Sequence, residues 1–191
     1  MGLRDTIFGR TKQVAPQLDN IFALPSAALT LQSELDLVTS GQAGLCFKAG
    51  SGESSMLSDA DIMELLEFDA QKDSVRLTSD DLGFKWLVID DPTIDGLVTK
   101  IHAANSTMVD HGLGPRLLCA VFGFVPATPP GEGPVRLVYL LKQGTFYPFA
   151  PTGANQRDNE LELRVKSFLG TDLAMEKDLS RWMALWNLPV R

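Results

Sequence analysis

The stretch LLCAVFGFV at residues 117–125 is followed by the loop PATPPGEGP at 126–134, by VRLVYLL at 135–141 and by TFYPF at 145–149. Runs rich in β-branched and aromatic residues, bounded by Gly and Pro, are typical of β-strands. The connections are too short for helical crossovers, so we expect antiparallel hairpins. These runs predict the core of an antiparallel sheet.

Further strands are expected upstream of this region. Residues 75–77 and 84–89 are apolar runs separated by the turn SDDLG at 79–83, and residues 45–47 form a shorter strand candidate. The order of hairpins and helices favours an α+β fold: a single domain with a largely antiparallel sheet covered by helices. We expect this domain to span residues 13–191.

Helices are predicted at both ends and in the middle of the chain. The strongest follows Asp91-Pro92, an N-cap followed by proline, and ends near Gly112. A shorter helix begins at Ser58, which stands in a capping-box relation to Asp61. Residues 17–35 predict a short helix, a break at Pro25 and a second helix. Two C-terminal helices are expected, one ending at Gly170 and one carrying the apolar residues Leu179, Trp182, Met183 and Trp186.

The composition is that of a folded protein with a hydrophobic core. Of 191 residues, 45% are hydrophobic and 21% are charged, and 24 acidic against 17 basic residues give a net charge of −7. This charge repels phosphate backbones, so no nucleic acid partner is expected. No apolar run approaches the roughly 18 to 20 residues that cross a bilayer, and no signal peptide is evident. We therefore expect a cytoplasmic protein.

Residues 1–12 form a separate short amphipathic segment. It carries apolar side chains at helical spacing among basic ones, namely Leu3, Ile7 and Phe8 with Arg4, Arg10 and Lys12. Docking onto the chain's own domain is the favoured interpretation. A weak peripheral contact with the inner face of the membrane is the alternative.

The cysteines and histidines give no sign of a metal or cofactor. Cys46 and Cys119 each lie within an apolar strand-like run, which predicts buried thiols rather than a disulfide. The chain has only two histidines, the widely separated His102 and His111, and it has no CxxC. We therefore expect no zinc site and no cofactor.

The segment GTFYPFAPTG at residues 144–153 concentrates three aromatic residues beside turn residues. Rigid aromatic side chains beside turns make good binding surfaces. An edge strand with the aromatic side chains in the core fits the same residues. The hypothesis for a partner or ligand surface comprises Phe146, Tyr147, Phe149, Thr152 and Arg157.

Enzymatic activity is not expected. Asp110-His111 could act as an oriented general base, but the sequence places no nucleophile within its reach. The alternative is a small-molecule-binding sensor or enzyme with a pocket near Tyr147, Thr152, Arg157 and His111.

Several separated segments, in order, resemble one known family. They are GRTK at 9–12, DNIFALPSAA at 19–28, GTFYPFAPTG at 144–153, RDNELEL at 157–163 and DLSRW at 178–182. Together they resemble the PspA-associated protein family (PspAB) of actinobacterial and archaeal phage-shock systems. The resemblance covers nearly the whole chain.

The resemblance implies an accessory role in an envelope-stress response, in association with a PspA-type coiled-coil protein. It supplies no catalytic or binding residue for this chain. The leading hypothesis is therefore a non-enzymatic regulatory or adaptor protein that binds a PspA-like helical protein through an apolar or aromatic groove rimmed by charges.

Overall fold

The computed structural model describes residues 16–49, 58–66, 74–153 and 155–191. The N-terminal segment 1–12 predicted from the sequence lies outside these residues. The main elements in chain order are η1 (Asp19–Ala23), α1 (Leu24–Leu35), β1 (Leu37–Lys48), α2 (Asp59–Leu65), β2 (Val75–Ser79), β3 (Phe84–Asp90), α3 (Ile94–Asp110), η3 (Gly114–Arg116), β4 (Leu117–Pro126), β5 (Val135–Leu140), β6 (Thr145–Phe149), β7 (Pro151–Gly153), β8 (Gln156–Arg157), α4 (Asn159–Leu169) and η4 (Leu179–Arg181).

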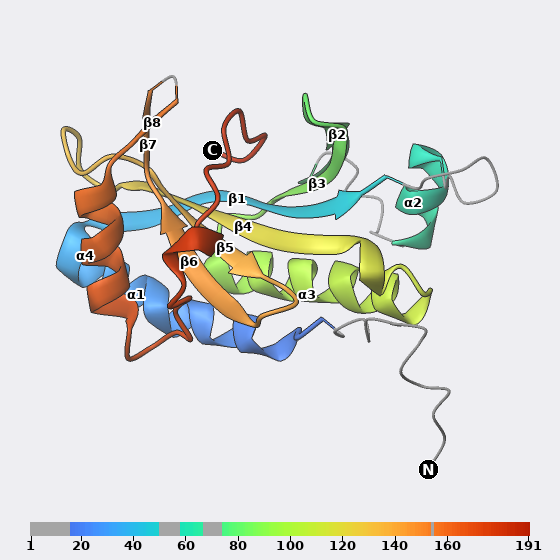
Figure 1. The fold of residues 1–191 in the computed structure, drawn as a ribbon, viewed down its shortest axis with the longest axis horizontal. Coiled ribbons are helices and arrows are strands. Elements are labelled where there is room, and N and C mark those ends of the chain that lie inside the picture. Colours follow the sequence, from blue (N-terminus) through green and yellow to red (C-terminus); the bar gives the residue numbers. More distant parts are fainter. Residues whose placement is uncertain (1–15, 50–57, 67–73, 154) are drawn as a thin grey trace, which may run out of the picture.

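A six-stranded sheet in the order β2-β3-β1-β4-β5-β6 forms the centre of the fold (Figure 1). Every neighbouring pair within it is antiparallel. The predicted hairpins β2–β3, β4–β5 and β5–β6 are all present. β7 and β8 form a small separate hairpin. The predicted single α+β domain with a largely antiparallel sheet is confirmed.

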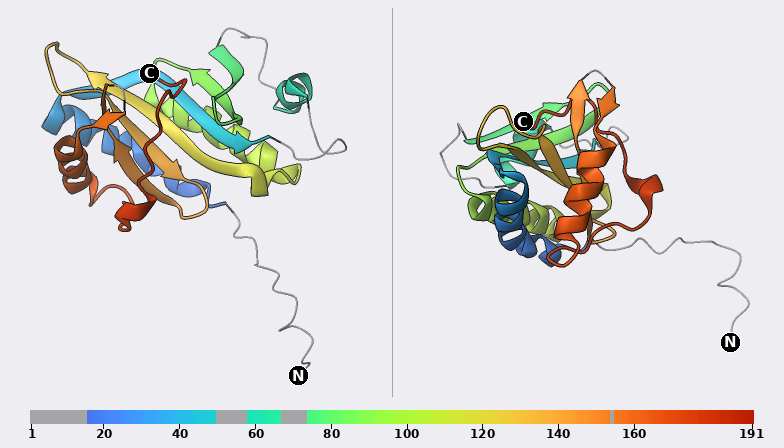
Figure 2. Two further views of the ribbon diagram at one scale, coloured as in Figure 1. Left: turned by 45° about the horizontal axis from the view of Figure 1, so that its top comes forward. Right: turned by 90° about the vertical axis from the view of Figure 1, so that its left-hand side faces the viewer.

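Helices cover one face of the sheet (Figures 1 and 2). Alternate residues of the strands, such as Leu45, Phe122 and Leu137, point to that face and join the apolar faces of α1, α3 and α4 in the main core. The intervening residues, such as Trp86, Val121 and Val138, point to the opposite face and form a second apolar cluster. Both faces of the central strands are therefore buried, and a different element covers each.

The predicted helix starts at residues 58 and 91 are close to those observed. Ser58 and Asp61 form the expected capping box of α2. The N-cap of α3 is Thr93, two residues after Asp91. Asp91 instead accepts hydrogen bonds from the backbone N–H and the hydroxyl of Thr93, at 2.9 and 2.8 Å.

The region before residue 48 differs from the prediction in two ways. The predicted short helix and second helix are η1 and α1, but α1 begins at Leu24, one residue before the break predicted at Pro25. Pro25 lies in the first turn of α1, where its missing N–H has no partner to lose. β1 begins at Leu37, eight residues before the predicted strand. Its first half has polar and glycine residues and an irregular register between Thr39 and Ala43, so it lacks the usual alternation.

The predicted second C-terminal helix is wrong. After the short η4, residues 182–191 have no helix and run along the sheet face opposite α1 and α3. We call residues 182–191 the C-terminal strap. Leu179, Trp182, Met183 and Trp186 follow a helical spacing, but packing onto the sheet stabilises an irregular path instead, with a turn at Trp186–Asn187.

Candidate functional site

The strap is held to the sheet through its backbone carbonyls. The Tyr147 hydroxyl donates to the Met183 carbonyl at 3.0 Å, and the Arg157 Nη1 donates to the Trp182 carbonyl at 3.0 Å. Further along, the Arg136 Nε donates to the Val190 carbonyl at 3.2 Å. In a helix these carbonyls would accept hydrogen bonds from backbone N–H groups of the same helix. Here the three side chains donate those hydrogen bonds instead.

Two glycines make room for the end of the strap. A Cβ at Gly44 would lie 2.6 Å from Cγ2 of Val190, and a Cβ at Gly123 would clash with the backbone oxygen of Arg191. Gly44 and Gly123 lie on the neighbouring strands β1 and β4. Glycine inside a strand often marks the close approach of another chain segment, and here that segment is the strap.

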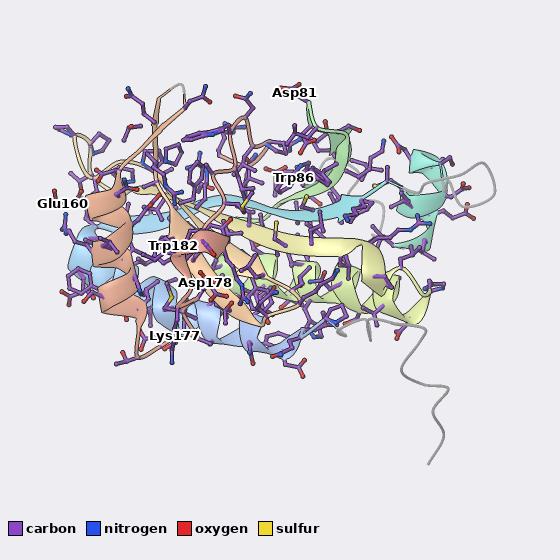
Figure 3. All side chains as sticks on the ribbon, in the orientation of Figure 1. Asp81, Trp86, Glu160, Lys177, Asp178 and Trp182 are labelled. Atoms are coloured by element: carbon purple, nitrogen blue, oxygen red, sulfur yellow. The ribbon has the colours of Figure 1, made fainter. Side chains whose placement is uncertain are left out.

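An apolar groove lies between the strap and the tip of the β2–β3 hairpin. Its volume is about 590 Å³, and it is open to solvent. Apolar and aromatic side chains from four regions line it, including Leu82, Phe84, Trp86, Leu118, Leu140, Tyr147, Met183, Leu185, Trp186 and Leu188. Figure 3 shows Trp86 on β3 and Asp81 at the outer end of the hairpin. We call this feature the strap groove.

The rim of the strap groove combines exposed apolar and charged side chains. Leu82 is 81% exposed and Met183 is 62% exposed, although both are large apolar residues. Asp80, Asp81 and Lys142 also line the groove. An apolar hollow with a mixed charged rim is the usual anatomy of a recognition site for an amphipathic segment.

The two cysteines lie side by side on the floor of the strap groove. Cys46 of β1 and Cys119 of β4 are register partners, and both are buried and free. The hydrogen bond from the Cys119 thiol and burial raise the pKa of Cys46 far above its ordinary value. The thiol is therefore protonated at neutral pH and is a poor nucleophile.

A second hollow lies on the other side of the strap, next to the β7–β8 hairpin. Its volume is about 410 Å³. Strap residues Leu185–Leu188 line both hollows, and the lining here also includes Arg136, Phe149, Pro151 and Asn155. Figure 1 shows the C-terminal end of the chain between the β2–β3 and β7–β8 hairpins. We call this second hollow the arginine pocket.

The guanidinium of Arg157 is occupied by contacts within the protein. Its Nε donates to both carboxylate oxygens of Glu162, at 2.8 and 3.0 Å, and Glu162 is 2% exposed. The guanidinium also lies 5.1 Å from the ring centroid of Phe149. Glu162 in turn accepts the backbone N–H of Ala150 at 2.8 Å. This network ties α4, β6 and the strap together.

The structure separates the residues of the predicted partner or ligand surface. Phe146 is fully buried in the main core, while Tyr147 and Phe149 are buried under the strap. Of the five, Tyr147 lines the strap groove and Phe149 lines the arginine pocket. Thr152 is exposed on β7, and Arg157 pairs with Glu162. The aromatic segment is thus an edge strand whose side chains lie beneath other residues.

His111 does not join the predicted pocket near Tyr147, Thr152 and Arg157. It caps the C-terminus of α3, where its Nδ1 lies 2.8 Å from the Thr107 carbonyl oxygen. α3 covers the opposite face of the sheet, so the sheet separates His111 from Tyr147. The residues that do line the groove with Tyr147, such as Leu82 and Met183, were not predicted.

The described residues show neither a metal site nor a membrane span. They contain no group of three His, Cys, Asp or Glu side chains placed to hold a metal ion. Within the same residues, no helix has both the length and the apolar character of a membrane span.

Fold and site together define an α+β protein whose antiparallel sheet carries helices on one face and, on the other, a non-helical strap beside an open apolar groove. The model of one protein family, described as PspA associated protein B (PspAB), matches residues 1–190, and the chain belongs to this family. Comparison with curated proteins and with solved structures gave no match. The resemblance noted from the separated sequence segments is thereby confirmed.

Proposed function

We propose that this chain is a non-enzymatic accessory protein of an envelope-stress response that binds a PspA-type coiled-coil protein in the strap groove. The family name gives an association with PspA and fits an accessory role. The observation that carries the proposal is the open apolar groove of about 590 Å³ with Leu82 and Met183 exposed at its rim. We further propose a cytoplasmic location, with residues 1–12 as the segment for any peripheral membrane contact.

The apolar and aromatic lining of the groove suits an amphipathic helix. Helices dock into apolar grooves by placing residues at positions i, i+3, i+4 and i+7 against them. Coiled-coil chains carry such apolar stripes along their length. Trp186 and Phe84, both half-buried, offer aromatic surface for these side chains, and aromatic residues often dominate the binding energy of an interface.

The chemistry of the groove supports binding over catalysis. Its cysteines are the obvious nucleophiles, and the raised pKa of Cys46 keeps its thiol protonated near pH 7. Asp80 accepts hydrogen bonds from Leu82 N, Phe84 N and Trp86 Nε1, at 2.9 Å each, and thereby shapes the hairpin. The polar groups of the groove therefore serve to hold its shape, which favours a binding surface.

Substitutions at the rim of the groove test the proposal. Leu82→Ser and Met183→Ser remove exposed apolar side chains, so they should leave folding intact and weaken binding to the PspA-type protein of the same organism at least tenfold. Leu29→Ser is the matched control, because Leu29 is 68% exposed on α1, away from the groove. Binding is measured by titration with the purified partner, and folding by thermal unfolding. Equal affinity for all variants, or weakening by Leu29→Ser alone, would contradict the groove as the binding site.

A further inference from the structure

Arg136 is a partly buried cation that lacks a carboxylate partner. It lies on β5 opposite Phe149 of β6 and points to the strap face of the sheet. Its Nε donates to the Val190 carbonyl, whereas its Nη1 is buried and has no hydrogen-bond partner among the described residues. None of the ion pairs between described residues includes Arg136, and burial lowers its pKa. An unpaired buried donor on a cation is costly to a folded protein.

The contrast with Arg157 shows that this face of the protein can pair a buried arginine. Arg157 also has one unpartnered nitrogen, Nη2, but its charge is matched by the buried carboxylate of Glu162 at 2.8 Å. Arg136, in contrast, contacts the uncharged carbonyl oxygen of Val190 where Arg157 contacts a carboxylate. The missing counter-charge at Arg136 is therefore a local feature of the arginine pocket.

The arginine pocket offers room for that counter-charge. Arg136 lines this hollow of about 410 Å³, a size within the range of small-molecule sites. Asn155 and Asn187 also line it, and their amide groups can donate hydrogen bonds to an anion. Trp186, Leu185 and Leu188 supply apolar surface. A cation and two amide groups that converge on one hollow, with apolar side chains beside them, can bind a ligand that has both an anionic and an apolar part.

We propose that the arginine pocket binds a small organic anion, with a carboxylate or phosphate group on Arg136 and an apolar or aromatic body against Trp186 and Leu188. A planar guanidinium presents paired N–H groups that fit both kinds of oxyanion. The proposal goes beyond the binding of a PspA-type protein and does not depend on it.

Calorimetric titration with simple aromatic probes tests the site. Benzoate and phenyl phosphate carry the two candidate head groups, and benzamide is the uncharged isostere of benzoate. We expect the protein to bind benzoate or phenyl phosphate at least tenfold more tightly than benzamide, at matched ionic strength. The tighter of the two anions identifies the head group. Equal binding of all three probes, or binding of none, would overturn the proposal.

Arginine variants localise the bound anion. Arg136→Gln should lower the affinity for the preferred anion at least tenfold, while Arg164→Gln should not change it. Arg164 is the matched control because it loses the same charge from a surface pair with Glu132. Retained affinity in Arg136→Gln would overturn the proposal. If that variant does not fold, the 15N shift of the Arg136 Nε in the unmodified protein decides instead, since an anion on this guanidinium must move it and an absent shift excludes the contact.

Discussion

Trp86 on the floor of the strap groove donates its indole Nε1–H to Oδ2 of Asp80 at 2.9 Å. The other carboxylate oxygen of Asp80 accepts the backbone N–H groups of Leu82 and Phe84, both at 2.9 Å. One side chain therefore fixes the indole ring and also shapes the hairpin tip that carries Leu82. The hydrogen bonds of Asp80 thus connect the floor of the groove, at Trp86, to its rim, at Leu82.

Replacing Asp80 should loosen the groove without unfolding the protein. Asp80→Ala removes three hydrogen bonds to a carboxylate, and we expect a loss of about 1–3 kcal/mol in the free energy of unfolding. Amide exchange at Leu82 and Phe84 should become faster, and affinity for the PspA-type partner should fall. Asp81→Ala is the control for stability and amide exchange, because Asp81 is an exposed neighbour on the same turn. Unchanged exchange in Asp80→Ala would contradict the role given to this carboxylate.

The glycine at position 123 should be essential for docking of the strap. An alanine methyl group there would collide with the backbone oxygen of Arg191 and with Oγ of Ser40. We expect Gly123→Ala to lower stability by about 1–3 kcal/mol, as overpacking does, and to increase amide exchange in residues 182–191. Gly133→Ala is the control, since no atom lies within 4 Å of the added Cβ. If both variants behave alike, close packing at Gly123 does not hold the strap.

Two arginine ion pairs should differ sharply in their contribution to stability. Arg157→Gln leaves the carboxylate of Glu162, 2% exposed, without its cation, and breaking such a buried pair costs about 3–5 kcal/mol. The Arg164–Glu132 pair is 2.7 Å long but lies at the surface, so Arg164→Gln should cost less than about 1 kcal/mol. Urea unfolding measures both. Similar losses for the two variants would show that Glu162 tolerates ionisation without Arg157.

At alkaline pH the tyrosine hydroxyl groups should lose their protons only as the protein unfolds. The chain has two tyrosines, and both are buried. Burial and the charge of Asp19 raise the pKa of Tyr139 to about 12, and burial raises the pKa of Tyr147 further still. Because both pKa values are above the value of about 10 in the unfolded chain, their contribution to stability is complete below pH 10 and is lost as the pH rises toward 12.

Absorbance at 295 nm and circular dichroism, recorded together, check this expectation. Phenolate should form only as the native signal disappears, and at pH 10 to 11 the folded protein should show little phenolate. In denaturant, both tyrosines should titrate near pH 10. Half of the phenolate absorbance appearing near pH 10 in the native protein would mean that one hydroxyl is accessible and that its hydrogen bond is weak.

Much of the fold could be predicted because its signals are local. The strands at 117–125 and 145–149 have β-forming residues between turn residues, and the capping box of Ser58 and Asp61 needs only four residues. The first half of β1 could not be predicted in the same way, since Gly41 and the polar residues around it form an irregular strand held by β4.

The strap was missed because long-range contacts decide its conformation. Trp182 and Trp186 have helical spacing, yet Tyr147 and Arg157, both more than 20 residues away, bind the carbonyls of their segment and hold it in a non-helical path. The available sequence signal is Gly123, a glycine inside a predicted strand, together with Gly44, which directly precedes the strand predicted at residues 45–47. A groove of apolar character was predicted, but of the five predicted surface residues only Tyr147 lines it. Leu82 and Met183 could not be predicted because they meet only through the tertiary fold.

The most direct test of the central claim is size-exclusion chromatography with light scattering on this protein and the PspA-type protein of the same organism, mixed at micromolar concentration. An apolar groove as the main contact predicts a shared peak with the mass of a complex at both low and high salt, because screening weakens only the charged rim. The Leu82→Ser and Met183→Ser variants should lose that peak. Separate elution of the two unmodified proteins at both salt concentrations would contradict direct binding.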